Sequence, residues 1–552
     1  MDNKEKVQSD KGSVIGDRND SNGDKGSIVG NRSDSNGDKG SVAGDRNDSN
    51  GGRSDELLAL IRNGEVMTLG QQLQLAVRLS VPAIIAQLSS IVMQYIDAAM
   101  VGHLGAEASA SIGLVSTTTW LFGGLCVAAA TGFSVQVAQK IGAGDFSGAR
   151  SILRQGLSTA FIFSILVAAT GIAISSGLPR WLGGDASIRS NASLYFLIYS
   201  LFIPTLQMNY LAGSMLRCSG NMRVPSIAGV AMCVLDVIFN FFLIFPSKEY
   251  KVWNMSFTVP GAGLGVEGAA LGTALAEALC AAVLLWYLWT RSKELRLSTR
   301  ISHPQKNESA SAGISHPQIA DTKAVESFRP QAATLKNALK IGLPMGLEHA
   351  MICGAQIMTT IIVAPLGVFA IAANSFAVTA ESLCYMPGYG ISDAATTLVG
   401  QSIGAGRKKL TRRFANITVI MGMCTMGIMG VLMYFFAPEI IGLMTPVTEI
   451  RDLGVMALRV EAYAEPMFAA SIVAYGVFVG AADTLAPCLM NLFSIWGVRL
   501  TLATLLAPPL GLKGVWIAMC IELCFRGTIF LIRLSGKRWM KRGAAANIVE
   551  SD

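Results

Sequence analysis

Two carboxylates and one amide in the N-terminal half stand inside long apolar segments and could bind a cation. Asp97 lies in the segment LAVRLSVPAIIAQLSSIVMQYIDAAMVGHLG, and Asp236 precedes Asn240 by four residues in VLDVIFNFFLIF. A carboxylate inside a membrane-spanning helix is costly and usually marks a functional site. These oxygens could hold Na⁺, or the two carboxyls could share a proton, because proximity and desolvation both favour the protonated form. The alternatives are that Asp97 is solvated near a helix end and that Asp236 only fixes its helix.

The C-terminal half carries a second set of ionisable residues inside apolar segments. They are Glu348, His349, Glu381, Glu461, Glu465, Arg499, Glu522 and Arg526. We predict a substrate or second cation site among Glu348, His349, Glu381 and Glu465. Glu348 and Glu465 are favoured because they lie near Pro344 and Pro466, which we place inside helices. His349 could relay protons. Arg499 and Arg526 must neutralise some of the acids, since unpaired buried charge is expensive. Internal ion pairs, or a packing role for His349, are the alternatives.

The elements that must position these residues are membrane-spanning helices. Of the 552 residues, 51% are hydrophobic and only 15% are charged, whereas a soluble domain has about 25% charged residues. Helices are the spanning form that pairs every backbone group in lipid. We count twelve apolar segments of suitable length. Their limits are 75–101, 107–134, 151–177, 191–216, 224–246, 265–290, 335–363, 367–394, 411–436, 452–478, 486–508 and 511–532.

Lysine and arginine concentrate in alternate loops, which predicts an orientation. The loops after even-numbered segments and the C-terminal tail are rich in both residues, as in the run 407–413, and the opposite loops are sparse. The positive-inside rule then places both termini in the cytoplasm. No organelle address is present, which favours a cell membrane, plasma or inner. The net charge of +7 follows from this pattern and does not indicate a nucleic-acid partner.

Polar segments divide the chain into five predicted parts. These are a tail at 1–66, a first lobe at 67–290, a cytoplasmic linker at 291–334, a second lobe at 335–535 and a cytoplasmic tail at 536–552. The first tail holds three copies of a 14-residue polar repeat and should be disordered, because it has almost nothing to bury. The linker holds His303 and His316, which we expect to be solvated. We predict no metal centre and no cofactor, apart from the H⁺ or Na⁺ that the two carboxylates could bind.

The two lobes are copies of one repeat. An offset of 262 residues pairs Pro82 with Pro344 and Gly142 with Gly404, and it falls to 246 after the fifth helix because the first lobe has 16 extra residues there. Six helices per repeat give both lobes the same topology, as in transporters that rock around a central cavity. The predicted fold is all-α, with twelve transmembrane helices in two parallel six-helix repeats. A channel would more often need several copies around one pore, so the repeat favours a transporter. We expect a monomer.

The repeat also separates scaffold residues from site residues. The offset maps Asp97, Asp236 and Asn240 onto Thr359, Val498 and Leu502, so the first lobe owns a polar cluster that the second lacks. Asp97 and Asn240 lie at similar distances from the ends of helices that run in the same direction, so their heights should match. Asp236 should lie one turn deeper on the same face as Asn240.

Several motifs together resemble the multidrug and toxic compound extrusion (MATE) family. They are LSVPAII, YIDAAMVGHLG, AQKIGAGD, LRCSGNMRVP, DVIFNFFLIF, GQSIGAGR and GAADTLAP, and the match covers about residues 68–535. The resemblance implies a two-lobed antiporter that exports small organic compounds, often cationic, in exchange for H⁺ or Na⁺. By position, Asp97 matches the family's helix-1 aspartate, and Asp236 with Asn240 matches its helix-5 pair, which commonly begins with Asn. One subgroup of the family has a helix-7 glutamate at the position of Ile352 here. Glu348 lies one turn earlier, so the role of that glutamate is not transferred to it.

Three other functions remain as alternatives. A lipid-linked oligosaccharide flippase of the same superfamily would need Arg and Lys in its cavity for pyrophosphate, and the first-lobe helices have few. A membrane-embedded enzyme would need a catalytic motif, and we find no HExxH, GxSxG or paired-aspartate prenyl motif. A sensor with the N-terminal tail as its output arm is the third. We therefore predict a transporter that is not an enzyme.

Overall fold

The computed structural model describes residues 49–252, 255–297 and 328–542. The chain divides into two compact units, Met1–Ser49 and Asn50–Asp552, and the second holds almost all of the described residues. The predicted polar repeats, His303 and His316 lie outside the described residues.

The first half of the second unit contains seven helices and one hairpin after a short leading helix, α1 (Ser49–Arg62). They are α2 (Leu69–Gly102), α3 (Ala106–Gly142), α4 (Phe146–Ile174), α5 (Leu178–Trp181), α6 (Ala186–Cys218), α7 (Arg223–Ile244), β1 (Pro246–Val252), β2 (Met255–Ala262) and α8 (Val266–Thr290). The antiparallel β1–β2 hairpin occupies the 16 residues that the first half has in excess. The helix α1 departs from the predicted disordered tail at 1–66, whose last part is helical.

The second half repeats this plan without a hairpin. Its elements are α9 (Ala332–Val363), η1 (Ala364–Leu366), α10 (Val368–Gly404), α11 (Lys408–Met444), α12 (Thr448–Glu461), α13 (Glu465–Gly480), α14 (Leu485–Leu492), the π-helix η2 (Phe493–Arg499), α15 (Leu500–Leu510), α16 (Leu512–Ser535) and α17 (Arg538–Arg542). The segment from α14 to α15 is continuous and forms one span.

Twelve spans result, as predicted. Within the described residues, ten helices have the length and hydropathy of a membrane span, and the bent pair α12–α13 gives an eleventh. The twelfth is α6, whose 33 residues correspond to about 50 Å of helix. It packs against α3, α4 and α8, and its polar residues Ser200 and Gln207 are buried. The protein is an all-α polytopic membrane protein with two six-helix repeats.

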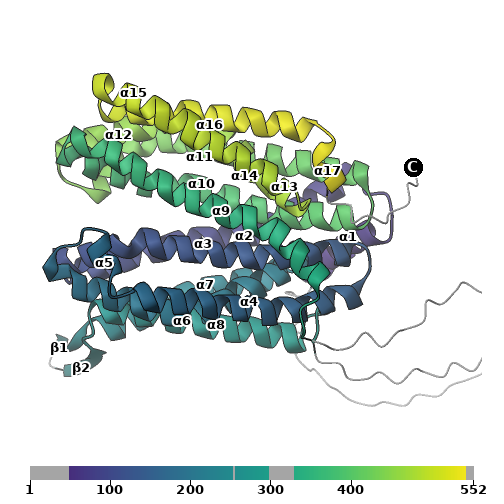
Figure 1. The fold of residues 1–552 in the computed structure, drawn as a ribbon, viewed down its shortest axis with the longest axis horizontal. Helices are drawn as coiled ribbons and strands as arrows, with labels where there is room; N and C mark the ends of the chain where they lie inside the picture. Colours follow the sequence, from purple (N-terminus) through teal and green to yellow (C-terminus); the bar gives the residue numbers. More distant parts are fainter. Residues whose placement is uncertain (1–48, 253–254, 298–327, 543–552) are drawn as a thin grey trace, which may run out of the picture. The chain divides into compact units, whose positions relative to one another are not determined.

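The two halves form two helix bundles whose axes run side by side (Figure 1). They meet where α2 packs on α10 and where α3 packs on α9, two contacts that the repeat makes equivalent. Glycine permits the close approach: a Cβ on Gly132 would lie 2.5 Å from the Ala338 carbonyl oxygen, and one on Gly390 would lie 2.6 Å from the Ile84 nitrogen. Small residues at helix contacts are the usual means of close packing in lipid.

The tenth span is broken, which corrects one prediction. We expected a single segment at 452–478 with Pro466 inside it. The structure breaks the span between Glu461 and Glu465 with a bend of 61°, and Pro466 stands in the first turn of α13. Proline is tolerated there, because the first helical N–H groups have no partner within the helix. Pro344 lies inside α9 as predicted.

Candidate functional site

The structure brings Asp97, Asp236 and Asn240 together between α2 and α7. The Asn240 amide donates one hydrogen bond to Asp97 Oδ1 at 2.9 Å and another to Asp236 Oδ2 at 3.1 Å. Asp236 and Asn240 are buried, and Asp97 is half-buried. The proximity predicted from helix direction and helix face is therefore confirmed. The role of the three residues in binding a cation stays a prediction.

Two oxygens of this cluster lack a hydrogen-bond partner among the described residues. Asp236 Oδ1 and Asn240 Oδ1 are buried and accept no hydrogen bond from the described residues. Thr273 of α8 provides a hydroxyl beside Asp236, and Gly272 lets Asn240 approach α8, since a Cβ there would overlap Asn240 Oδ1. Two carboxylates, an amide oxygen and a hydroxyl are the ligand types that small hard cations prefer. The residues thus fit Na⁺ or a carboxyl-bound proton.

Glu277 of α8 belongs to the same region and was missed by our sequence reasoning. It follows Thr273 by one helical turn, which places both on one face of α8. It lies close enough to Asp236 to interact with it electrostatically. The offset of 246 maps Glu277 onto Leu523. The same comparison of halves that selected Asp97 would therefore have selected Glu277.

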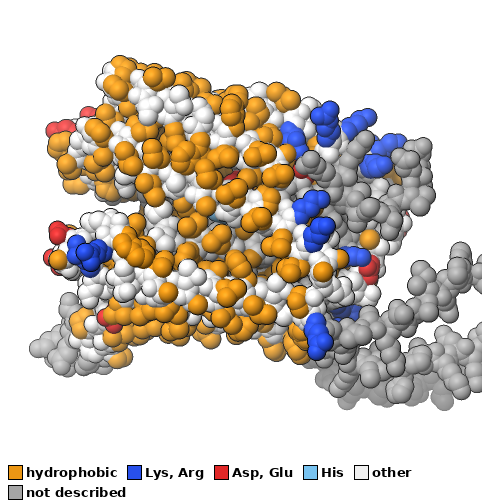
Figure 2. Space-filling view, viewed as in Figure 1, with side chains coloured by type: hydrophobic (Ala, Val, Ile, Leu, Met, Phe, Trp, Pro, Cys, Tyr) orange, Lys and Arg blue, Asp and Glu red, His pale blue; other side chains and the backbone are white. Residues whose placement is uncertain are grey.

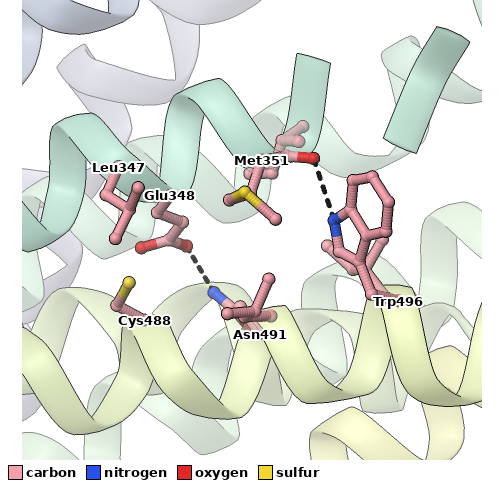
Figure 3. A pocket seen from close by; sticks show the side chains of 9 residues that line it. Leu347, Glu348, Met351, Cys488, Asn491 and Trp496 are labelled. Atoms are coloured by element: carbon pink, nitrogen blue, oxygen red, sulfur yellow. Dashed lines mark hydrogen bonds between the residues drawn. The ribbon is translucent and has the colours of Figure 1, made fainter. Parts of the chain in front are cut away.

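Glu348 of α9 stands beside a small pocket between α9 and the α14–η2 span. The Asn491 amide donates to Glu348 Oε1 at 2.5 Å, and the Tyr475 hydroxyl donates to Oε2 at 2.6 Å. Figure 3 shows Glu348 and Asn491 facing each other, with Met351 and Trp496 on the apolar wall. Both donors are neutral, and among the described residues no arginine forms a direct ion pair with this carboxylate.

Asn491 and Tyr475 were also missed by the sequence reasoning. The offset of 262 maps Asn491 onto Gly229 and Glu348 onto Ala86, so both polar residues belong to one half only and the comparison of halves could have found them. In the first half, a Cβ on Gly229 would lie 3.9 Å from the Ala86 methyl group. The same helix crossing therefore carries an acid–amide pair in one half and small residues in the other. The same offset maps Tyr475 onto Gly213, so the comparison of halves could have found this residue as well.

The other predicted residues of the second half do not join Glu348. His349 packs against Gly124 of α3, at the contact between the halves. Glu381 lies next to Glu461. Glu465 is fully buried near Cys384, and its carboxylate oxygens accept no hydrogen bond from the described residues. Glu381 and Glu465 lie close enough to Glu461 and to each other to interact electrostatically. The structure therefore keeps these two predicted residues together and places them apart from Glu348 and His349.

The two arginines have partners that the sequence left open. Arg526 Nε lies 3.1 Å from Glu522 Oε1, and the Ser494 hydroxyl donates to the same oxygen at 2.6 Å. The Arg526 guanidinium also lies over the Phe468 ring. Arg499 donates to the Met519 sulfur. Arg526 therefore neutralises Glu522, which agrees with the ion-pair alternative for that acid.

Twelve spans in two parallel repeats, with a buried acid–amide pair in each half, define a two-repeat membrane transporter. The MatE family profile matches residues 82–242 and 344–505, one match in each half. The chain belongs to the MatE family.

Curated relatives cover nearly all of the membrane part of the chain. "Probable multidrug resistance protein NorM" of Thermotoga maritima is 24% identical over 468 residues, which is 84% of this chain and 93% of that protein. The protein of the same name from Pseudomonas aeruginosa is 28% identical over 456 residues, covering 81% of this chain and 85% of that protein.

Solved structures show the same fold. A MATE protein in complex with MaL6 has a TM-score of 0.74 at 19% identity and covers 87% of this chain and 98% of its own. A MOP superfamily transporter from Pyrococcus furiosus, described as having a binding pocket of reverse polarity, also has a TM-score of 0.74 at 19% identity and covers 89% and 99%. At this level of identity the likeness concerns the fold alone.

Proposed function

We propose that the protein is a secondary antiporter that exports small organic compounds, often cationic, in exchange for H⁺ or Na⁺ by alternating access. The observation that carries the proposal is the acidic cluster of Asp97, Asp236 and Asn240, which has buried oxygens free to accept a cation. The names of its relatives, multidrug resistance proteins, support organic compounds as the exported class.

Cation binding at this cluster would act on α2. With both carboxylates ionised, two negative charges lie close together and share the Asn240 amide as a donor. A proton or Na⁺ removes part of that repulsion and competes with the amide for the same oxygens. Because Asp97 belongs to α2 and α2 holds Pro82 in its interior, a change at Asp97 can bend or shift the helix that packs on α10. The ion drives the cycle only by binding the two states of the transporter with different affinity.

In the second half, Glu348 is our candidate for the residue that binds the positive charge of an organic cation. Its pocket combines one carboxylate with an apolar wall that includes Met351, Ile352 and Trp496. An aromatic face and a carboxylate are both attractive to a cation. An acid in the pocket favours this class over the pyrophosphate that a lipid-linked oligosaccharide flippase would bind.

The distribution of basic residues supports a cytoplasmic location for the end of the bundle that carries α1 and α17. Figure 2 shows Lys and Arg gathered at that end of the visible face. By the positive-inside rule this end faces the cytoplasm. We propose a multi-pass cell-membrane protein, active as a monomer, with both termini inside.

Reconstitution tests the antiport directly. Purified protein in liposomes loaded with ethidium should release the dye when a pH gradient or a Na⁺ gradient is imposed, and each gradient is applied separately. An ionophore that collapses the effective gradient should stop the release. Dye that does not move with either gradient, from protein that is folded and correctly inserted, would refute the proposal.

A further inference from the structure

Two equivalent hydrogen bonds join the halves at the end that carries α1. The Gln139 side-chain amide of α3 donates to the Gly480 carbonyl at 3.2 Å, and that of Gln401 in α10 donates to the Cys218 carbonyl at 2.9 Å. The offset of 262 relates Gln139 to Gln401 and Cys218 to Gly480. We call this pair of bonds the glutamine latch.

Close backbone contact accompanies the glutamine latch. A Cβ on Gly142 would overlap the Gln401 carbonyl, and a Cβ on Gly404 would overlap the Gln139 carbonyl. The ends of α3 and α10 therefore cross with no side chain between them. Arg217 adds a contact that the repeat does not duplicate: its Nε lies 3.7 Å from Asp393 Oδ2 across the halves. This end of the molecule is shut by direct contact.

The helix α1 lies over this closed end and contacts both halves through polar groups. On the side of the first half, Arg62 Nη1 lies 3.3 Å from Glu294 Oε1, and Lys293 Nζ lies 2.8 Å from Asp55 Oδ2. On the side of the second half, Arg407 Nη1 donates to the carbonyl of Leu60 at 2.9 Å.

The apolar face of α1 also spans the two halves. Leu57, Leu58 and Ile61 are buried in one cluster. That cluster takes Met222 from the first half and Leu398, Leu410 and Phe414 from the second. Leu58 fills the space over Gly220, beside the glutamine latch. A 14-residue helix is marginal in water by itself, so the order of α1 depends on this docking.

We propose that α1 is a strap that holds this end of the transporter closed and that it must release the second half before this end can open. The inference rests on the alternating-access cycle proposed above, but it does not depend on the coupling ion. The strap stays with the first half, because only the short connection between Arg62 and Leu69 separates α1 from α2. The contacts that must break are the Arg407–Leu60 hydrogen bond and the packing on Leu410 and Phe414.

A native cysteine reports on the opening. Cys218 is 4% exposed, and its carbonyl accepts the Gln401 bond of the glutamine latch. A membrane-impermeant maleimide added from the α1 side of full-length protein in liposomes should modify Cys218 only when this end opens. Peptide mass spectrometry separates Cys218 from the other nine cysteines.

The decisive variant is Arg407→Ala, which removes the only polar contact named above between α1 and the second half. The maleimide reaction at Cys218 should become about tenfold faster, as expected for loss of one charge-assisted hydrogen bond. Arg407→Lys keeps a donor and should restore a rate near that of the wild type. Arg413→Ala, which removes an exposed arginine from α11, the helix that begins directly after Arg407, should leave the rate unchanged.

A second variant keeps the test independent of α1 folding. Gln401→Ala removes one hydrogen bond of the glutamine latch without changing α1, and it should also accelerate modification of Cys218. If Gln401→Ala accelerates the reaction and Arg407→Ala does not, α1 is not a strap. If Arg407→Ala lowers the melting temperature and leaves Cys218 protected, α1 only stabilises the fold, and the proposal is overturned.

Discussion

Asn240 determines how the first-half cluster is held. An amide nitrogen can donate two hydrogen bonds, and Asn240 uses both on carboxylates, one on α2 and one on its own helix. Its oxygen is left without a donor among the described residues, as is one oxygen of Asp236. The helix-5 pair begins with Asp here, whereas the MATE resemblance implies that it commonly begins with Asn. The structure shows that this pair still directs one amide and one carboxylate toward Asp97.

Asp97→Asn tests this cluster. The substitution keeps the size and removes the charge that a cation must neutralise. We expect ion-driven dye efflux to fall at least about tenfold, the value of one charge-assisted interaction, while the protein remains folded in the membrane. The measurement is efflux from liposomes with matched amounts of protein. Asp452→Asn, at an exposed position, is the control and should retain wild-type efflux; wild-type efflux from Asp97→Asn would remove Asp97 from the mechanism.

Glu348→Gln tests the second-half pocket. Glutamine can still accept from the Tyr475 hydroxyl, but it presents no net charge to a ligand. We expect about tenfold weaker competition by a permanently cationic substrate, since a charged hydrogen-bond partner contributes 1.5–3 kcal/mol, and no change for a neutral compound of similar shape. Competition against ethidium transport measures both. Equal losses for the two compounds would show that Glu348 supports the fold of the pocket and does not select charge.

At the scale of elements, contact between α7 and α8 sets the depth of the first-half cluster. Gly272 allows Asn240 to lie against α8, and Gly268 allows α8 to approach the end of α7, since a Cβ there would lie 2.5 Å from the Leu243 carbonyl. Glycine inside a helix costs about 1 kcal/mol relative to alanine. The two glycines are therefore unfavourable for α8 by itself, and close packing beside the site is what offsets that cost.

Gly272→Ala and Gly229→Ala form a matched pair for this contact. Both gain helix propensity, but the first inserts a methyl group into Asn240, whereas the second places it 3.9 Å from Ala86, an ordinary contact. We expect Gly272→Ala to destabilise the protein by about 1–3 kcal/mol, the range for overpacking, and to weaken ion-driven efflux. Gly229→Ala should be neutral or slightly stabilising. Thermal unfolding in detergent and efflux in liposomes measure the two effects, and identical behaviour of the variants would show that α8 tolerates displacement at Gly272.

At the scale of the whole molecule, the sequence predicted what depends on helix direction, helix period and the repeat. Those three quantities place Asp97 near Asn240, and they predicted twelve spans and the extra segment that forms the hairpin. They do not encode which helix lies beside which within a bundle. For this reason the sequence did not reveal that Glu348 is separate from Glu381, or that His349 faces the other half. The break between α12 and α13 and the docking of α1 depend on tertiary contacts, which no local pattern revealed.

The orientation of the whole molecule gives the last prediction. The ends of the bundle differ in charge: the turns near α1 hold the run Arg407–Arg413, whereas the end with the β1–β2 hairpin has few basic residues in its described turns. Moving clustered Lys and Arg across a bilayer is unfavourable, so the basic end should stay in the cytoplasm. An epitope inserted at residues 253–254 should then be accessible to antibody on intact cells. An epitope at the C-terminus should become accessible only after permeabilisation.

Both epitopes are needed, because together they distinguish an inverted orientation from a wrong number of spans. If the hairpin epitope is hidden and the C-terminal epitope is exposed, the molecule is inverted, and the α1 strap would close the outer end of the transporter. If both are exposed, the number of spans between them is even and the twelve-span count is wrong, since seven spans should lie between the hairpin and the C-terminus. A further span before the hairpin would require α1 or α5 to cross the membrane. These helices have only 14 and 4 residues, and a spanning helix needs about 20.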